Sequence, residues 1–353
     1  EMCIRDRYNI MESYGLHAIV VNPAHMKAVP GRKTDVKDAE WIAELLQHGL
    51  LQPSYIPSKD QRELRELVQY RKSLVGERTR ELNRLQKMLE GANIKLSGTV
   101  TNINGKSARK ILEYILSGNE IDEKKYDEMY EEKLIAHNLK ASKEQILDDL
   151  KGFMSPLQRR MLKELLQHLD ELNVHIENLN DEIDNFMKPE EKQASQVIQD
   201  VTGIGNTSAQ TIIAVIGTDM ERFPSDRHIS SWAGLCPGDN VSAKKRKSGK
   251  IRKGNALLKS TLVLCAHAAV RHKSSYFHAQ FKRISTHRGK KRAYVAVAHS
   301  ILIAIYHILK EGVRYQDLGA EYYNQFNAER KIHAYLKKLK ALGLSLIHIS
   351  EPT

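Results

Sequence analysis

The hydrophobic positions of two long segments recur at helical spacing. From Gln61 to Leu89, apolar residues repeat every seven positions at Val68, Val75, Leu82 and Leu89. In a second segment they alternate at steps of three and four, at Leu162, Leu165, Leu169, Leu172, Ile176, Leu179, Ile183 and Phe186. Such spacing is typical of the contact stripe of a coiled coil. We therefore expect two long helices that pack on each other or on copies from another subunit.

The start of the chain follows a different pattern. The run Leu16–Asn22 is rich in β-branched residues and ends at an Asn-Pro pair, which predicts a buried strand. Asp35 then begins a helical pattern with Ile42 and Leu45 on its apolar face and Gly49 after its end. Together, the strand, loop and helix predict a small α/β part.

Beyond Ala194, apolar helices alternate with glycine-containing turns. Four helices are expected: Ser195–Ile216, interrupted at Gly203-Ile204-Gly205, then Asp226–Ala233, Asn255–His272 and Lys291–Lys310. A basic loop, Pro237–Gly254, lies between the second and third helices. The expected fold is mainly α with a small α/β part. We place the domains at residues 8–58, 59–190 and 191–343.

Length and composition narrow the class of protein. A chain of 353 residues is long enough for two or three domains. Its three cysteines, Cys3, Cys236 and Cys265, provide no disulfide framework, which favours a reducing, cytoplasmic setting. The longest apolar run, Ala293–Leu309, is interrupted by polar residues, so we expect no membrane-spanning segment.

The positive charge lies in the C-terminal part of the chain. The net charge is +12, with 55 Lys and Arg against 43 Asp and Glu. Residues 1–200 carry a net charge of −4, and residues 201–353 carry +16. From Asn240 to Lys310 there are 17 basic residues and no acidic residue. This distribution predicts contact with a polyanion, nucleic acid above all.

The turn Gly203-Ile204-Gly205 is the first candidate for phosphate binding. Two glycines between short helices, followed by the small Ala209, are the pattern of a helix-hairpin-helix. The glycines let backbone N–H groups approach a phosphate, and the next helix presents its positive end to it. The alternative is a tight turn with no ligand.

The basic loop is the second candidate. Seven of its ten residues from 244 to 253 are basic: Lys244, Lys245, Arg246, Lys247, Lys250, Arg252 and Lys253. These cations could hold a phosphate beside the hydroxyl of Ser242 or Ser248 and stabilise attack on phosphorus. A loop serine without a catalytic role and a nuclear-localisation signal are the alternatives.

Asp35 and Asp38 form the third candidate. Residues three apart in a helix lie on one side of it, so their carboxylates could share a Mg²⁺ ion for phosphoryl transfer. Helix capping by Asp35 and a favourable first-turn position for Asp38 explain the same pair without a metal.

The two ends of the chain differ from the rest. Residues 1–7 and 344–353 resemble translated sequencing-adapter sequence, and we expect native sequence to run from Tyr8 to Gly343. A pair of frayed natural tails is the alternative.

Four segments, taken in order, resemble one protein family. They are KTDVKDAEWIAELL at Lys33–Leu46, VTGIGNTSAQTIIAVIG at Val201–Gly217, RFPSDRHISSWAGLCPG at Arg222–Gly238, and KIRKGNALLKSTLV at Lys250–Val263. The chain resembles the DEDD-type insertion-sequence transposases, a family that includes the Piv-type DNA invertases. The resemblance extends from about Tyr14 to Tyr323.

The resemblance implies a division of catalytic roles. Family members join an N-terminal RuvC-like (RNase H-like) domain to coiled-coil helices and a C-terminal transposase domain with a serine nucleophile. Asp35 and Asp38 match the last pair of four acidic ligands, here for Mg²⁺, and Ser242 matches the nucleophile five residues after Pro237. Relatives often have Ser-Gly where this chain has Ser242-Ala243. The other two acids would precede Leu16–Asn22, so an N-terminally truncated, inactive domain is expected.

By resemblance, the protein would be a transposase or site-specific DNA recombinase. It would cleave and exchange strands through a phosphoserine–DNA intermediate in a bacterial or archaeal cell. Its expected partners are DNA, an element-encoded guide RNA used by some members, and further copies joined through the coiled-coil helices. A non-catalytic DNA- or RNA-binding protein and a Holliday-junction-type endonuclease are the alternatives.

Overall fold

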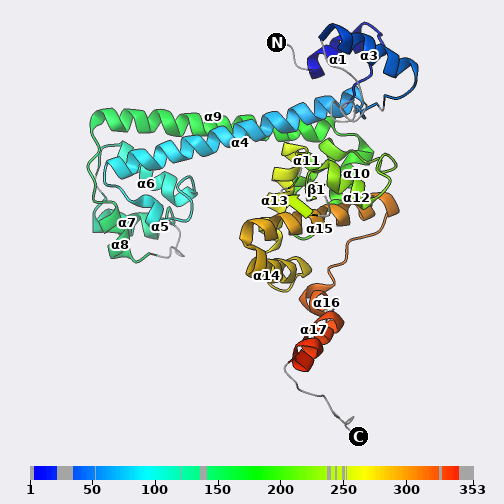
Figure 1. Ribbon diagram of the computed structural model, residues 1–353. Helices are drawn as coiled ribbons and strands as arrows, with labels where there is room; N and C mark the ends of the chain where they lie inside the picture. The colour runs from blue at the N-terminus through cyan, green and yellow to red at the C-terminus, as the bar shows by residue number, and fades with distance from the viewer. Residues whose placement is uncertain are drawn as a thin grey trace. The chain divides into compact units, whose positions relative to one another are not determined.

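Helices form most of the structure (Figure 1). The computed structural model describes residues 4–21, 35–51, 53–119, 121–135, 141–236, 240–242, 245–248, 251, 253–325 and 328–341. The chain divides into two units, Glu1–Arg62 and Glu63–Thr353. Within the described residues the sheet is limited to one two-stranded ribbon, which confirms the prediction of a mainly α fold.

The first unit contains the helices α1 (Ile4–Ser13) and α3 (Asp35–Gln47). Helix α3 lies where the sequence predicts it, and Gly49 follows its last turn with a left-handed φ of 65°. Of the two apolar positions used to predict this helix, Leu45 is buried and Ile42 is 37% exposed. Helix α1 was not predicted, because the sequence interpretation treated residues 1–7 as foreign to the fold.

The predicted strand at Leu16–Asn22 is wrong. The structure shows no strand over residues 16–20, Val21 makes one isolated antiparallel bridge to Pro53, and the last residue of the run lies outside the described residues. Leu16 is 61% exposed, so the run is not a buried one either. A strand needs a ladder of backbone partners, and proline has no N–H to contribute to one.

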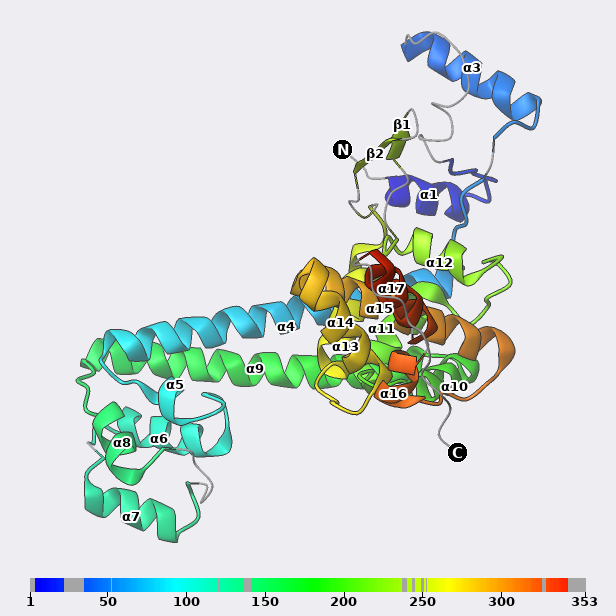
Figure 2. The same cartoon turned by 60° about the horizontal axis from the view of Figure 1, so that its bottom comes forward.

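The two long helices predicted from the seven-residue repeats are α4 (Lys59–Gly91) and α9 (Pro156–Phe186). They lie side by side and run in opposite directions, as Figures 1 and 2 both show, so the expectation that they pack on each other is confirmed. Helix α9 begins with a capping box, in which Ser155 Oγ accepts from the Gln158 N–H (3.2 Å) and Gln158 Oε1 accepts from the Ser155 N–H (2.9 Å).

The buried side of α9 follows the predicted stripe closely. Its buried residues are Leu162, Leu166, Leu169, Leu172, Ile176, Leu179 and Ile183. Leu166 takes the place expected for Leu165, and Phe186 at the end is 39% exposed. A straight helix has 3.6 residues per turn. Residues chosen at a spacing of 3.5 per turn therefore move away from the contact face toward the ends of the helix.

Polar contacts interrupt the apolar stripe between α4 and α9. Arg78 donates to Asn173 Oδ1 (3.2 Å), and His168 Nδ1 lies 2.6 Å from the carboxylate of the buried Glu81. Burial alone would raise the pKa of Glu81, but hydrogen bonds from His168 and Arg84 outweigh it and lower the pKa. These contacts join specific positions on the two helices and so fix their axial register.

Among the described residues between α4 and α9, the structure has four short helices. They are α5 (Leu96–Thr99), α6 (Lys106–Leu116), α7 (Glu123–Glu131) and α8 (Lys143–Asp149). Their apolar residues form one core with Leu85 and Leu89 of α4 and the first turns of α9. The acidic residues of α7 are exposed, and Asp127 pairs with Lys143.

The helices that follow α9 are α10 (Pro189–Ile198), α11 (Asn206–Ile216), α12 (Asp226–Trp232), α13 (Ala256–Ala269), α14 (Tyr276–Arg288), α15 (Lys290–Glu311), α16 (Gly319–Gln325) and α17 (Ala328–Ala341). Helices α10 to α15 form a second core with α4 and α9, to which the described residues of α16 and α17 do not belong. The four helices predicted here are confirmed, and Asn255 caps α13 through a side-chain bond to the Leu258 N–H (3.0 Å). Helices α14, α16 and α17 were not predicted.

Helix α15 corrects one statement made from the sequence. By length and hydropathy this helix could cross a membrane, although the polar residues within its apolar run led us to expect no membrane-spanning segment. Its buried residues belong to the second core: Ala293, Val297, Ala298, Ile301, Leu302, Ile305, Tyr306 and Ile308. A core helix of a soluble protein passes the same test, so this helix alone is weak evidence for a membrane span.

Candidate functional site

Asp35 and Asp38 both lie in the first turn of α3. Their spacing of three residues puts them on one side of that helix. The positions of their side chains lie outside the described part of the structure. Among the described residues, no group of three or more His, Cys, Asp or Glu side chains could hold a metal ion.

The predicted basic loop contains an antiparallel ribbon of β1 (Asn240–Ser242) and β2 (Lys245–Ser248). In its register Ser242 pairs with Lys245, and Val241 pairs with Arg246. Directly opposed residues share a face of such a ribbon. The backbone therefore places a lysine opposite the candidate nucleophile.

Other predicted phosphate-binding residues of this loop are only partly described. Lys244, Lys250 and Arg252 lie outside the described residues, as do the side chains of Lys245, Arg246 and Lys247, whereas Lys253 is exposed. After the loop, the chain packs closely on the end of α12. A Cβ at Gly254 would lie 2.4 Å from the Ala233 carbonyl carbon and the Gly234 nitrogen. Glycine is thus required where the chain leaves the loop.

The turn Gly203-Ile204-Gly205 joins α10 to α11, as the sequence predicts. Gly203 has a φ of 94°, and a Cβ there would lie 2.5 Å from the Cys265 carbonyl oxygen and 2.6 Å from the Ala269 nitrogen. Ile204 is buried. Gly205 differs, since nothing lies within 4 Å of its Cβ position and no side chain caps α11. Of the three predicted contact residues, Gly205 is the one that leaves room for a phosphate.

Arg71 of α4 holds the start of α11. It is 2% exposed and donates to Gln210 Oε1 (2.6 Å), the Thr207 carbonyl (3.0 Å), Asn180 Oδ1 (3.0 Å) and Thr211 Oγ1 (3.2 Å). Burial lowers its pKa to about 10, so the guanidinium stays charged at neutral pH. The sequence interpretation missed Arg71, although a charged residue within an apolar heptad stripe is a detectable signal.

A second arginine of α4 contacts the other end of α11. Arg65 donates through Nε to the Ala214 carbonyl (3.0 Å) and through Nη2 to the Val215 carbonyl. A cation at the C-terminal carbonyls of a helix interacts favourably with its dipole. Because Arg65 and Arg71 belong to one helix, α4 fixes both ends of the helix that follows the glycine turn.

An acidic residue lies beside the glycine turn. Asp317 accepts hydrogen bonds from Thr202 Oγ1 (3.3 Å), the Tyr276 N–H (3.0 Å) and the Gly319 N–H (2.8 Å). Burial, and then the charge of Asp317, raise the pKa of Tyr315 to about 12. A carboxylate next to the turn weakens its attraction for a phosphate.

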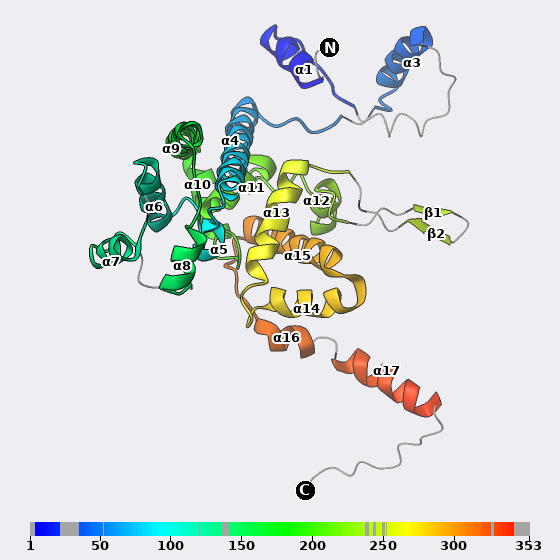
Figure 3. The same ribbon diagram turned by 90° about the vertical axis from the view of Figure 1, so that its left-hand side faces the viewer.

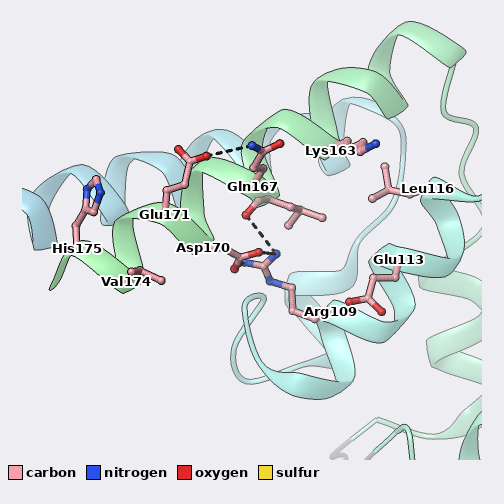
Figure 4. A pocket seen from close by; sticks show the side chains of 10 residues that line it. Arg109, Glu113, Leu116, Lys163, Gln167, Asp170, Glu171, Val174 and His175 are labelled. Carbon is pink, nitrogen blue, oxygen red and sulfur yellow. Dashed lines mark hydrogen bonds and ion pairs between the residues drawn. The ribbon is translucent and has the colours of Figure 1, made fainter. Parts of the chain in front are cut away.

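A groove of about 500 Å³ between α6 and α9 has walls of mixed charge. Figure 4 shows Arg109 of α6 directed at Asp170 of α9, with which it forms an ion pair (2.7 Å). Glu113, Glu171 and Lys163 also line it. Arg109 already faces an acid, so the groove fits a role in holding α6 against α9 better than a phosphate site.

Comparison with known proteins gives matches to two family models. Residues 5–94, which include Asp35 and Asp38, match a model of IS110-type DEDD proteins whose description is transposase. Residues 195–282, which include the glycine turn and Ser242, match the model described as transposase IS116/IS110/IS902 family. The chain is also 24% identical over 314 residues to the transposase for insertion sequence element IS1111A of Coxiella burnetii, covering 88% of this chain and 76% of that protein.

Proposed function

Because this chain belongs to the IS110-type DEDD transposases, a family of DNA-cleaving and DNA-recombining enzymes, we propose that it exchanges DNA strands with Ser242 as nucleophile. The register that places Lys245 opposite Ser242 carries the proposal. An ammonium group supplied from the opposite strand would favour the ionised serine and stabilise the charge that develops on phosphorus. The family assignment makes a non-catalytic binding protein the weaker interpretation.

The proposed step is a transesterification at one DNA strand. Ser242 Oγ forms a bond to the scissile phosphorus, and the bond from phosphorus to the leaving deoxyribose oxygen breaks. The serine hydroxyl loses its proton, and the leaving oxygen gains one. The product is a serine–phosphate ester to DNA, which a second deoxyribose hydroxyl resolves by the reverse reaction, so the number of phosphodiester bonds is conserved.

We propose that Asp35 and Asp38 hold a divalent cation, Mg²⁺ by family resemblance, for this reaction. Their oxygen donors fit a hard cation, and their place in one turn of α3 lets both face the same ion. The bound metal would supply charge neutralisation at the phosphate. The two residues contribute the negative charge that retains it.

The glycine turn and the basic loop are proposed contacts to the nucleic-acid backbone. Gly205 leaves space for a phosphate at the start of α11, while Gly203 and Ile204 hold the turn against α13. Lys253 is an exposed cation of the loop. Contacts of this kind position DNA, or an element-encoded guide RNA, without selecting a base sequence.

Assembly into a homo-oligomer through α4 and α9 is part of the same proposal. Their outer side keeps apolar residues in water, with Leu157 67% and Met161 50% exposed. Met161 and Leu165 line a mostly apolar groove of about 760 Å³ with Met88. A second copy covering this stripe would bury it. We place the enzyme in the cytoplasm of a bacterial or archaeal cell, where its DNA substrate lies.

The Ser242→Ala variant tests the proposal in a version of the protein that carries all four acidic ligands expected from the resemblance, with Ser248→Ala in the same ribbon as its matched control. The substrate is a plasmid that carries the chain's own gene with its flanking DNA. We expect Ser242→Ala to lose the covalent protein–DNA adduct on denaturing gels and to lower strand exchange at least about 10³-fold. Ser248→Ala should retain both.

Two outcomes would contradict the serine mechanism. One is an adduct that survives in Ser242→Ala. The other is strand cleavage that survives in Ser242→Ala and is lost in Asp35→Asn, which would favour a metal-dependent junction endonuclease.

A further inference from the structure

Four cations surround the tight turn between α14 and α15, which Figure 3 shows as neighbouring helices. We call Arg288, Lys290, Lys291 and Arg292 the basic corner. All four residues are exposed. Gly289 between them has a φ of 81°, and a Cβ there would meet nothing within 4 Å. The corner therefore projects into solvent.

Three charges of the basic corner, those of Lys290, Lys291 and Arg292, oppose the electrostatics of the helix that contains them. The first turn of α15 contains three cations and no acidic residue, and no side chain caps the helix. The positive end of a helix favours acids and disfavours cations. Three adjacent cations there also repel one another. This arrangement costs folding stability, and a polyanionic partner would remove the cost.

The helices that form the basic corner bring no carboxylate near it. In the described part of the chain, none of its four cations pairs with an acid in the observed salt bridges. The sequence of α13, α14 and α15 contains no Asp or Glu before Glu311. The positive potential of the corner is thus not cancelled locally.

Tyr294, one turn after Lys290 in α15, stacks on a ring of α13. The His267 and Tyr294 rings are stacked, with their centroids 3.5 Å apart. The centroid of the Phe281 ring lies 4.5 Å from that of Tyr294. His267 is exposed. A flat ring beside cations suits the sugar and base edges of a nucleic acid.

An anionic membrane surface fits the corner less well. Membrane-surface helices insert large apolar side chains beside their cations. Among the described residues of α14 and α15, no large hydrophobic side chain is exposed. A partner that has regularly spaced phosphates but no lipid interior matches the basic corner better than a membrane does.

We propose that the basic corner binds the phosphodiester backbone of DNA, independently of base sequence. The choice of DNA as partner rests on the proposed function. The contact is separate from the glycine turn and from the Ser242 ribbon, since its residues belong to the α14–α15 junction. It holds the DNA on the C-terminal helices before and after strand cleavage.

The test measures how salt weakens binding of the full chain to a short DNA duplex of arbitrary sequence. The variant replaces Arg288, Lys290, Lys291 and Arg292 with glutamine. Each neutralised phosphate contributes about 0.9 to the slope of log K against log salt, so loss of four contacts should lower the magnitude of the slope by about 3.6. The thermal midpoint should stay the same or rise, because the first turn of α15 loses its repulsion.

A control of equal charge change replaces the exposed Lys87, Lys124, Arg160 and Lys163 with glutamine. It should change the salt slope by less than about 1. Equal slopes for the two variants would overturn the proposal, as would a corner variant with unchanged slope. Binding is measured without strand cleavage, so failure of the Ser242 mechanism would leave this result unaffected and remain distinguishable from it.

Discussion

Gly203 and Gly205 occupy one turn but differ in what a side chain would meet. At Gly203 a methyl group would clash with the α13 backbone, and the left-handed φ adds strain. We expect Gly203→Ala to lower the free energy of unfolding by about 3 kcal/mol or more. Gly205→Ala should change it by less than about 1 kcal/mol, because its Cβ position is open. Urea denaturation of both variants measures the difference, and equal losses would contradict this account.

His299 gives the C-terminal helices a pH dependence. Burial lowers the pKa of its imidazole, and the nearby Asp226 carboxylate offsets this only in part. The unfolded chain therefore binds the proton more readily, near its ordinary pKa of about 6.5. The stabilising effect of the neutral ring is present above that pH and is lost as the pH falls through it.

His299→Gln should weaken that loss of stability. We expect the urea midpoint of the variant to fall less than that of the wild type between about pH 7.5 and about pH 5. His48→Gln, at an exposed position after α3, serves as the control. A His299 variant with the full wild-type pH dependence would assign the effect to other groups.

Single residues were predictable where the backbone restricts their type. The glycines of the turn and the helix start at Asn255 follow from local sequence, and the structure bears both out. Arg71 was missed because its partners come from α9 and α11, more than 100 residues away. Ser242 and Asp35 were selected by resemblance to a family, since their local sequence also fits ordinary loop and capping roles.

At the scale of helices, Arg71 joins α4 to both α9 and α11. Arg71→Met would leave the polar groups of Gln210, Asn180 and Thr211 buried without their donor. We expect a loss of about 3 kcal/mol in the free energy of unfolding. Arg80→Gln, exposed on the same helix, should cost less than about 0.5 kcal/mol. Chemical denaturation checks both, and a small effect for Arg71→Met would show that the buried groups find other partners.

Long elements with a regular apolar pattern were the most predictable. The seven-residue repeats located α4 and α9, because one stripe of each helix is buried along its length. The run at Leu16–Asn22 has strand-like composition, but pairing depends on a neighbouring strand that no local pattern specifies. Helix α14 escaped prediction since its polar positions, including His278 and Gln280, obscure the apolar stripe.

At the scale of the whole molecule, the distribution of charge along the sequence was a better guide to function than the predicted fold was. The acid-free stretch from Asn240 to Lys310 pointed to nucleic acid, in agreement with the family assignment. The sequence does not show how this charge is distributed on the surface. The structure places the Ser242 ribbon and the basic corner in different elements of the C-terminal part. Sequence alone counts charges but does not show which of them are exposed together.

The polar contacts between α4 and α9 restrict how this protein can change length during evolution. Arg71 meets Asn180, Arg78 meets Asn173, and Glu81 meets His168, each pair matching a level of one helix to a level of the other. An insertion of seven residues into α4 alone would leave every pair beyond it mismatched. Compensating insertions, one in each helix, would preserve the pairs and move the two cores apart by about 10 Å at 1.5 Å per residue. Homologues of different length are therefore expected to carry such insertions in pairs.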